Sequence, residues 1–125
     1  SFKKLIKTTR CVAVMDGFYE WKRSKESKTP FYFTREDKKP LYVAGIFENN
    51  EFCLITEEAS QNLTDIHHRQ PVILDHDEIS NYLDLKKDGK KYLSKINKIP
   101  LNFYEISKEV NKPTNNYPSL ISKLN

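Results

Sequence analysis

A single carboxylate stands inside an aromatic run near the start of the chain, and this run is the first candidate for chemistry. Glu20 lies between Tyr19 and Trp21, and Phe18 precedes them. A carboxylate enclosed by aromatic rings is poorly solvated, so its pKa should rise toward neutrality, where it can exchange protons. The alternative is a strand whose Glu20 points to water while the rings fill the core, and spacing alone favours this simpler arrangement.

The histidines are the second candidate. His67 and His68 are adjacent, and on a strand they would point to opposite sides. His76 follows nearby, but no acidic residue stands at a recognisable ligand spacing, so no metal site or other cofactor is predicted. The chain also has no nucleophilic serine elbow, and its three glycines leave little material for a phosphate-binding loop. What remains is Glu20, one histidine ahead of an arginine and a proline, and a basic surface.

Length and composition limit the class of protein. The 125 residues suffice for one domain with its own core, and 30% charged with 38% hydrophobic residues is typical of globular chains. No apolar stretch is long enough to span a membrane and no signal peptide is evident, so a cytoplasmic location is predicted. Cys11 and Cys53 lie in apolar runs and are predicted to be buried thiols. The net charge of +4 is compatible with a polyanionic partner.

The elements that must position these residues are mostly strands. Residues 11–15 form an unbroken apolar run, typical of a strand buried on both faces. Asp16 and Gly17 end it with a turn or bulge, for which glycine's tolerance of positive φ is suited. Strands this close together favour an antiparallel meander that curls or closes. Short polar turns separate further predicted strands at residues 30–34, 41–47, 52–56, 72–74 and 103–107.

Helical signals are short. A helical turn is predicted within residues 57–66, then a helix over residues 77–85 capped by Asp77, and another at residues 89–98. Residues 1–9 are basic and weakly patterned, which favours a solvated end, although their lysines also suit phosphate. The predicted fold is therefore α+β, a curled, barrel-like, mainly antiparallel sheet with short peripheral helices in one domain.

Three segments resemble one known family. Residues 10–22 resemble the Arg-Cys…Asp-Gly-Phe-Tyr-Glu-Trp motif of the SOS response-associated peptidase (SRAP) family, the abasic-site processing proteins. Residues 66–74 resemble its Ile-His-Asp-Arg-Met-Pro-Val-Ile-Leu segment, and residues 110–121 resemble its closing Val-Asn and Pro-x-Leu-Ile stretch. Three motifs in the right order are far more specific than one. The resemblance therefore favours a functional Glu20 over a solvated one.

The resemblance implies a protein that binds single-stranded DNA and processes abasic sites. Family members capture the open-chain sugar aldehyde with an amino-terminal cysteine, whose amine and thiol close a thiazolidine and leave a covalent protein–DNA crosslink. The family's Glu and His correspond to Glu20 and His67, with roles in proton transfer during ring opening and imine formation. The candidates for contacting DNA are Arg69, Trp21, Lys22, Lys3 and Lys4.

Two departures from the family pattern lead to alternatives. His68 replaces the usual Asp, which changes the charge beside His67. The family's Cys-Gly-Arg start and Asn-Ala-Arg motif have no counterpart in the printed chain, so it is predicted to correspond to the later part of an SRAP domain and to lack the nucleophile, with a missing segment or a second chain supplying it. One alternative is a non-catalytic single-stranded DNA-binding or regulatory module. Another, suggested by the family's name alone, is a peptidase.

The resemblance gives Glu20 and His67 proton-transfer roles at the same sugar. We therefore expect the side chains of Glu20 and His67 to meet in one cleft, although the two residues are far apart in the sequence.

Overall fold

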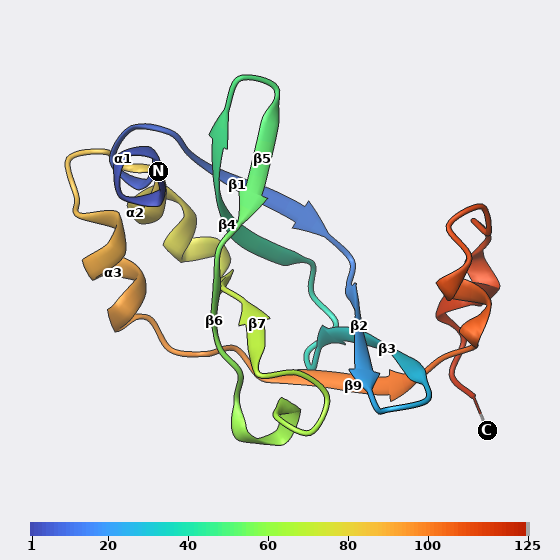
Figure 1. The fold of residues 1–125 in the computed structure, drawn as a ribbon. Coiled ribbons are helices and arrows are strands. Elements are labelled where there is room, and N and C mark those ends of the chain that lie inside the picture. Colours follow the sequence, from blue (N-terminus) through green and yellow to red (C-terminus); the bar gives the residue numbers. More distant parts are fainter. Residues whose placement is uncertain (125) are drawn as a thin grey trace.

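Two principal antiparallel sheets form the framework of the computed structural model, which describes residues 1–124 (Figure 1). One sheet has the order β1-β4-β5 with β8 also paired to β4, the other has the order β2-β3-β9, and β6 pairs with β7. The strands are β1 (Arg10–Met15), β2 (Phe18–Arg23), β3 (Lys28–Arg35), β4 (Leu41–Glu48), β5 (Glu51–Leu54), β6 (Thr56–Glu58), β7 (Arg69–Pro71), β8 (Ile73–Leu74) and β9 (Leu101–Glu105). Among these residues neither sheet closes on itself, so the mainly antiparallel α+β class is confirmed and the barrel-like closure is not.

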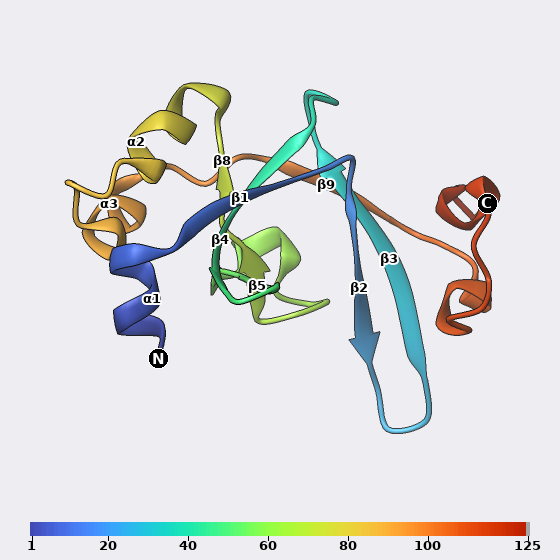
Figure 2. The ribbon, with the colours of Figure 1, turned by 90° about the horizontal axis from the view of Figure 1, so that it is seen from above.

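The helices gather at the end of the molecule where the β1-β4-β5 sheet lies, and the C-terminal 3₁₀ turns lie at the opposite end, beyond β2-β3-β9 (Figures 1 and 2). None of the helices within residues 1–124 is long and apolar enough to cross a membrane. The α-helices are α1 (Phe2–Thr8), α2 (Ile79–Leu83) and α3 (Gly89–Lys95), and the 3₁₀ turns are η1 (Gln61–Leu63), η2 (His76–Glu78), η3 (Lys108–Asn111) and η4 (Pro118–Ile121).

Strand β4 is buried on both faces, because its alternate side chains enter two different cores. Ala44 and Ile46 pack beneath α1 and α2 in the first core. Leu41 and Val43 pack in the second core, together with side chains of β3 and β9. Tyr82 of α2 is fully buried, and its hydroxyl donates a 2.6 Å hydrogen bond to a backbone carbonyl of β4, which fixes the helix on the strand.

β1 lies at the edge of its sheet, and only Arg10 among its six residues is buried, so the prediction that this strand is buried on both faces is wrong. Val14 is 67% exposed. The cysteines predicted as buried thiols are free, with Cys11 half-buried and Cys53 exposed. Gly17 ends β1 without a positive φ. Glycine is needed there for another reason, because a Cβ would clash with the ring of Tyr32.

Other differences concern the short elements. Residues 1–9 do not form a solvated end, because α1 buries Ile6 against the first sheet. Asp77 is not a helix cap and lies inside η2, whereas Asp88 caps α3 by accepting the backbone N–H of Lys91 at 3.1 Å. The helical turn predicted within residues 57–66 is confirmed as η1, which occupies residues 61–63 and is preceded by β6. The strand predicted at residues 52–56 is divided at Ile55 into β5 and β6.

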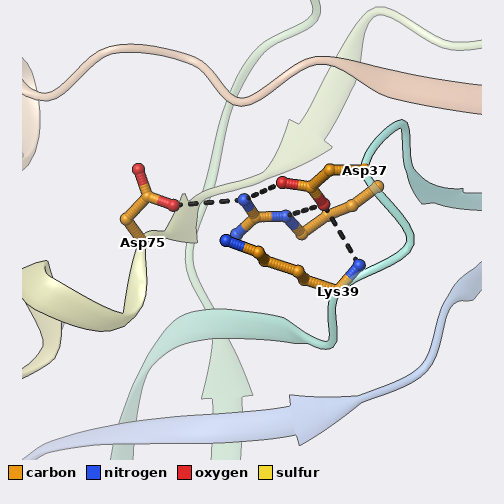
Figure 3. A network of polar contacts seen from close by, with 4 residues as sticks. Asp37, Lys39 and Asp75 are labelled. Atoms are coloured by element: carbon orange, nitrogen blue, oxygen red, sulfur yellow. Dashed lines mark hydrogen bonds and ion pairs between the residues drawn. The ribbon is translucent and has the colours of Figure 1, made fainter.

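A polar network fixes the turn between β3 and β4 (Figure 3). The buried Arg35 guanidinium donates to both carboxylate oxygens of Asp37, at 2.8 and 2.6 Å. It also donates to Asp75, at 3.1 Å, and so joins the turn to the segment after β8. The Lys39 backbone N–H donates to Asp37 at 3.1 Å. The hydrogen bond from Arg35, followed by that from Lys39, lowers the pKa of Asp37 to about 2.

We expect this network to make the stability of the fold pH-dependent at the acid end. The Asp37 carboxyl has an ordinary pKa of 3.8 and a folded pKa of about 2. Its contribution is therefore complete above about pH 4 and is lost as the pH falls through about 2. Asp37→Asn should lower the melting temperature at neutral pH and weaken its decline below about pH 4.

Thermal melting followed by circular dichroism across the acid range measures both effects. Asp65→Asn is the matched control, because Asp65 is an exposed carboxylate after η1 that takes no part in the hydrogen bonds of Arg35. An Asp37→Asn melting curve with the parent's acid dependence would contradict the assignment.

Candidate active site

The side chains of Glu20 and His67 lie next to each other although they come from separate parts of the chain. Glu20 belongs to β2 and His67 to the loop between η1 and β7. The Glu20 Oε2 is 3.9 Å from the His67 Nδ1, which confirms the expectation that the two side chains meet. The side chains are 28% and 35% exposed, respectively, so both remain accessible to a substrate from solvent.

Glu20 owes its position to the alternation of side chains along β2. Phe18 packs in the second core, and Glu20 follows on the same face, opposite Phe31 in the register with β3. Tyr19 and Trp21 lie on the other face, with their ring centroids 6.3 Å apart. The predicted enclosure of Glu20 by three rings is therefore wrong, because two of the rings point away from it. The carboxylate is oriented instead by the Trp21 backbone N–H, which donates to Oε1 at 3.0 Å.

Buried residues on both sides anchor the loop that carries His67. Leu63 and Ile66 pack in the second core, and the backbone N–H groups of Ile66 and His67 both donate to the Leu63 carbonyl. Gln70 is also buried, and its side-chain oxygen accepts a 2.8 Å hydrogen bond from the Ser60 N–H. Because the loop is closed at both ends, His67 is held at a fixed place beside β2.

The His67 ring is also in contact with the backbone of Arg69. The N–H and the carbonyl oxygen of Arg69 both lie 3.2 Å from Nδ1, so this nitrogen accepts or donates according to its tautomer. The His68 ring stacks on the His67 ring with centroids 4.7 Å apart. The two histidines lie in a loop and not on a strand, so the opposite orientation that a strand would impose does not apply to them.

The Arg69 side chain has a defined direction. Its guanidinium donates to the Thr56 carbonyl at 2.9 Å and to the Thr56 hydroxyl at 3.3 Å. This contact crosses the short β6-β7 pair, in which Arg69 lies opposite Glu58. Sequence reasoning missed Thr56, because pairing between two three-residue strands leaves no periodic signal.

Lys22 and Trp21, both predicted to contact DNA, lie on opposite faces of β2. Lys22 is exposed and shares the face of Glu20. Trp21 is half-buried on the other face, where its Nε1–H donates to Asn111 at 2.5 Å. The Lys28 ammonium lies 4.7 Å from the centroid of the Trp21 ring. The indole is thus already held by a hydrogen bond and by a cation–π contact.

Lys3 and Lys4, the remaining candidates, are not near this site. Both are exposed on α1, which lies apart from β2, at the end of the molecule where the helices gather (Figures 1 and 2). The structure therefore brings together Glu20, His67 and Arg69, with Lys22 on the same face. Within residues 1–124 no three His, Cys, Asp or Glu side chains are grouped so that they could hold a metal ion.

Chemically, the arrangement is suited to moving protons beside an anion. A carboxylate and an imidazole 3.9 Å apart can divide the roles of base and acid. The Arg69 guanidinium, held by Thr56 across the β6-β7 pair, has planar donors that match the geometry of phosphate.

The sequence profile of the family described as SOS response associated peptidase (SRAP) matches residues 1–113. The chain belongs to the SRAP family. The resemblance inferred from three motifs is thus confirmed. Abasic site processing protein YedK of Escherichia coli (strain K12) is 33% identical over 72% of this chain and 44% of its own length. YoaM of Bacillus subtilis (strain 168) is 30% identical over 100% and 61%, and HMCES of Gallus gallus is 32% identical over 94% and 44%. This SRAP chain spans about half the length of the curated relatives it matches.

The fold is also found in solved structures. A crystal structure of a protein from Bacteroides thetaiotaomicron superposes with a TM-score of 0.82 at 23% identity, covering 99% of this chain and 60% of that one. A protein from Bordetella bronchiseptica superposes with a TM-score of 0.67 at 22% identity, covering 82% and 57%. These two likenesses concern the fold alone.

We expect Asn111 to hold η3 against the Trp21 face of β2. Its amide accepts from the Trp21 indole at 2.5 Å and donates to the Lys28 carbonyl at 3.4 Å. Asn111→Ala should shift the fluorescence of Trp21, the single tryptophan, to longer wavelength, because the indole gains water. It should also lower the unfolding free energy by about 1 kcal/mol, the usual value for a lost hydrogen bond.

Urea unfolding followed by that fluorescence reports both quantities at once. Asn116→Ala is the control, because Asn116 is exposed in the same C-terminal segment. Unchanged emission in Asn111→Ala would show that the hydrogen bond does not shield the indole.

Proposed function

We propose that this chain is part of an abasic-site processing protein and that Glu20 and His67 transfer protons at the sugar of an abasic site in single-stranded DNA. The observation that carries the proposal is the 3.9 Å approach of the two side chains. The names of the relatives support the substrate, since these are called abasic site processing proteins. A cytoplasmic location is part of the same proposal.

The chemistry of an abasic deoxyribose explains why two groups are needed. The sugar exists mainly as a cyclic hemiacetal, and its reactive aldehyde forms only when the ring opens. Opening removes a proton from the anomeric hydroxyl and adds one to the ring oxygen. A carboxylate is suited to the first transfer and a protonated imidazole to the second. Glu20 and His67 are therefore proposed as base and acid for one ring.

Two cations near this site favour the binding of a DNA strand. The Arg69 backbone lies against the His67 ring, the Arg69 guanidinium is held by Thr56, and Lys22 lies on the face of Glu20. Phosphates on both sides of the sugar would be drawn to these charges. Trp21 remains a candidate for stacking on a base, although its indole N–H already donates to Asn111.

Covalent capture of the aldehyde, which the family resemblance implies, needs an amine and a thiol on one residue. Cys11 and Cys53 do not meet this condition, because each is internal and has its nitrogen in a peptide bond. For the printed chain, the proposal is therefore limited to opening the sugar and holding the DNA strand.

Ring opening is measurable without covalent capture. An alkoxyamine added in excess converts each free aldehyde to an oxime, so the rate of oxime formation on an abasic oligonucleotide follows ring opening. The parent chain should accelerate this rate, and Glu20→Gln should remove most of the acceleration, on the order of 10²-fold for a general base. His67→Asn should act in the same direction.

Glu105→Gln is the matched control, because Glu105 is an exposed carboxylate on the same face of the sheet, paired with Phe31 on the other side of β3. The role of Glu20 as a base is refuted if Glu20→Gln accelerates oxime formation as well as the parent does.

Arg69 should contribute a salt-dependent part of the affinity for single-stranded DNA. Fluorescence anisotropy at several salt concentrations gives the slope of log affinity against log salt. Removing one phosphate contact should reduce its magnitude by about 0.7 for a single strand. Arg69→Gln is expected to show this reduction.

Arg23→Gln is the matched control, because it removes the same charge from an exposed position on the other face of β2. Equal slopes for Arg69→Gln, Arg23→Gln and the parent would exclude a phosphate contact by Arg69.

A further inference from the structure

A basic cavity lies between α1 and the start of α3. These helices are at the end of the molecule where the helices gather, apart from β2 (Figure 1). The volume of the cavity is about 590 Å³, which is within the range of sites that hold small molecules or single nucleotides. One acid, Asp88, lines it, and the carboxylate of this residue already accepts a backbone N–H at the start of α3. The cations that line it are Lys3, Lys7, Arg10, Lys86, Lys87 and Lys90.

The charge of this cavity is exceptional for the chain. Six cations and one anion give the lining a formal charge of +5, whereas the whole chain has +4. The rest of the protein is therefore slightly acidic, and the basic character is concentrated here. Within residues 1–124 no carboxylate lies within 4.0 Å of a charged nitrogen of these six residues. A solvated face of mixed charge would have neither a large net positive charge nor a set of cations without carboxylate partners.

Arg10 forms the buried wall of the cavity and is only 7% exposed. Its guanidinium donates to four backbone carbonyls, those of Ile6, Tyr82, Asp84 and Lys87, at 2.5 to 3.0 Å. Carbonyl dipoles satisfy its hydrogen-bond donors but bring no formal negative charge. The positive charge is thus retained at the base of the cavity.

The same hydrogen bonds hold the lysines in place. They join α1, the end of α2 and the loop before α3. Four of the five lysines in the lining belong to α1 and to this loop, and the fifth, Lys90, follows in α3. The loop packs closely on the guanidinium, since a Cβ at Gly89 would lie 2.7 Å from two of its atoms. The lysine backbones are therefore positioned before any ligand arrives.

Apolar surface completes the site. Phe2 is 44% exposed and Leu85 is 52% exposed, and both line the same cavity. An aromatic ring beside several ammonium groups matches an unpaired nucleotide, whose base stacks while its phosphates are neutralised.

We propose that this cavity binds phosphate groups of a single-stranded nucleic acid, with Lys7 and Lys90 contacting phosphates and Phe2 contacting a base. The choice of a strand as the ligand rests on the proposed function, and the cavity would hold a segment remote from the abasic sugar. Free nucleotides and inorganic phosphate share the same chemistry, so the experiment has to separate these sources.

The test compares two variants that lose equal charge. Lys7→Gln/Lys90→Gln removes two cations of the cavity, and Lys38→Gln/Lys39→Gln removes two exposed lysines from the turn between β3 and β4. Both have a net charge of +2, and thermal melting checks that both are folded. Binding of an undamaged oligothymidine strand is measured by anisotropy at several salt concentrations. The magnitude of the salt slope should fall by about 1.4 for the cavity variant, two contacts of about 0.7 each, and much less for the turn variant.

Equal slopes for the two variants would overturn the proposal. So would a result in which adenosine diphosphate or inorganic phosphate loses affinity for the cavity variant while the strand binds both variants equally. Glu20→Gln, measured in parallel, keeps the two proposals apart. If it fails to slow oxime formation while the cavity variant loses salt dependence, the proposed function fails and this inference stands. If Glu20→Gln slows oxime formation while the two lysine variants have equal salt slopes, this inference fails and the proposed function stands.

Discussion

The burial of β4 on both faces is the constraint on which the rest of the structure depends. One face has to be covered by helices and the other by the second sheet and the loop after η1. Leu63 and Ile66 dock on that second face, and each buried side chain of this size contributes about 1.5–3 kcal/mol. An exposed ion pair contributes only about 0–1 kcal/mol. Apolar packing, and not attraction between Glu20 and His67, therefore brings the site together.

Much of the fold could be predicted because local patterns determine it. Alternating and apolar runs located most of the strands, and Phe31 and Phe33 share one face as their spacing requires. The pairing of the strands into sheets was less predictable. Consecutive strands β1 and β2 belong to different sheets, and the apolar run of β1 lies at an edge while β4 lies at the centre. An apolar run shows that a strand tolerates burial, but whether both faces are covered depends on segments distant in the sequence.

The candidate site, like the fold, was predictable only in part. Motifs identified Glu20, His67 and Arg69 correctly as neighbours, whereas the argument that three rings enclose Glu20 failed because it ignored the alternation of β2. The roles of Thr56 and of Asn111 at Trp21 were not readable from the sequence, since each contact joins residues far apart in the chain. The basic cavity was missed for the same reason, because α1 and the segment before α3 are about eighty residues apart.

The exposed edge of β1 has a consequence for how the protein behaves at high concentration. Within residues 1–124 β1 pairs only with β4, so its outer edge offers backbone donors and acceptors to another chain. Natural proteins usually block such an edge with charge, proline or a bulge. Here the strand is apolar and Val14 projects into solvent. Strand-to-strand aggregation through this edge is therefore expected in storage and crystallisation, and Val14→Lys is the simplest protection.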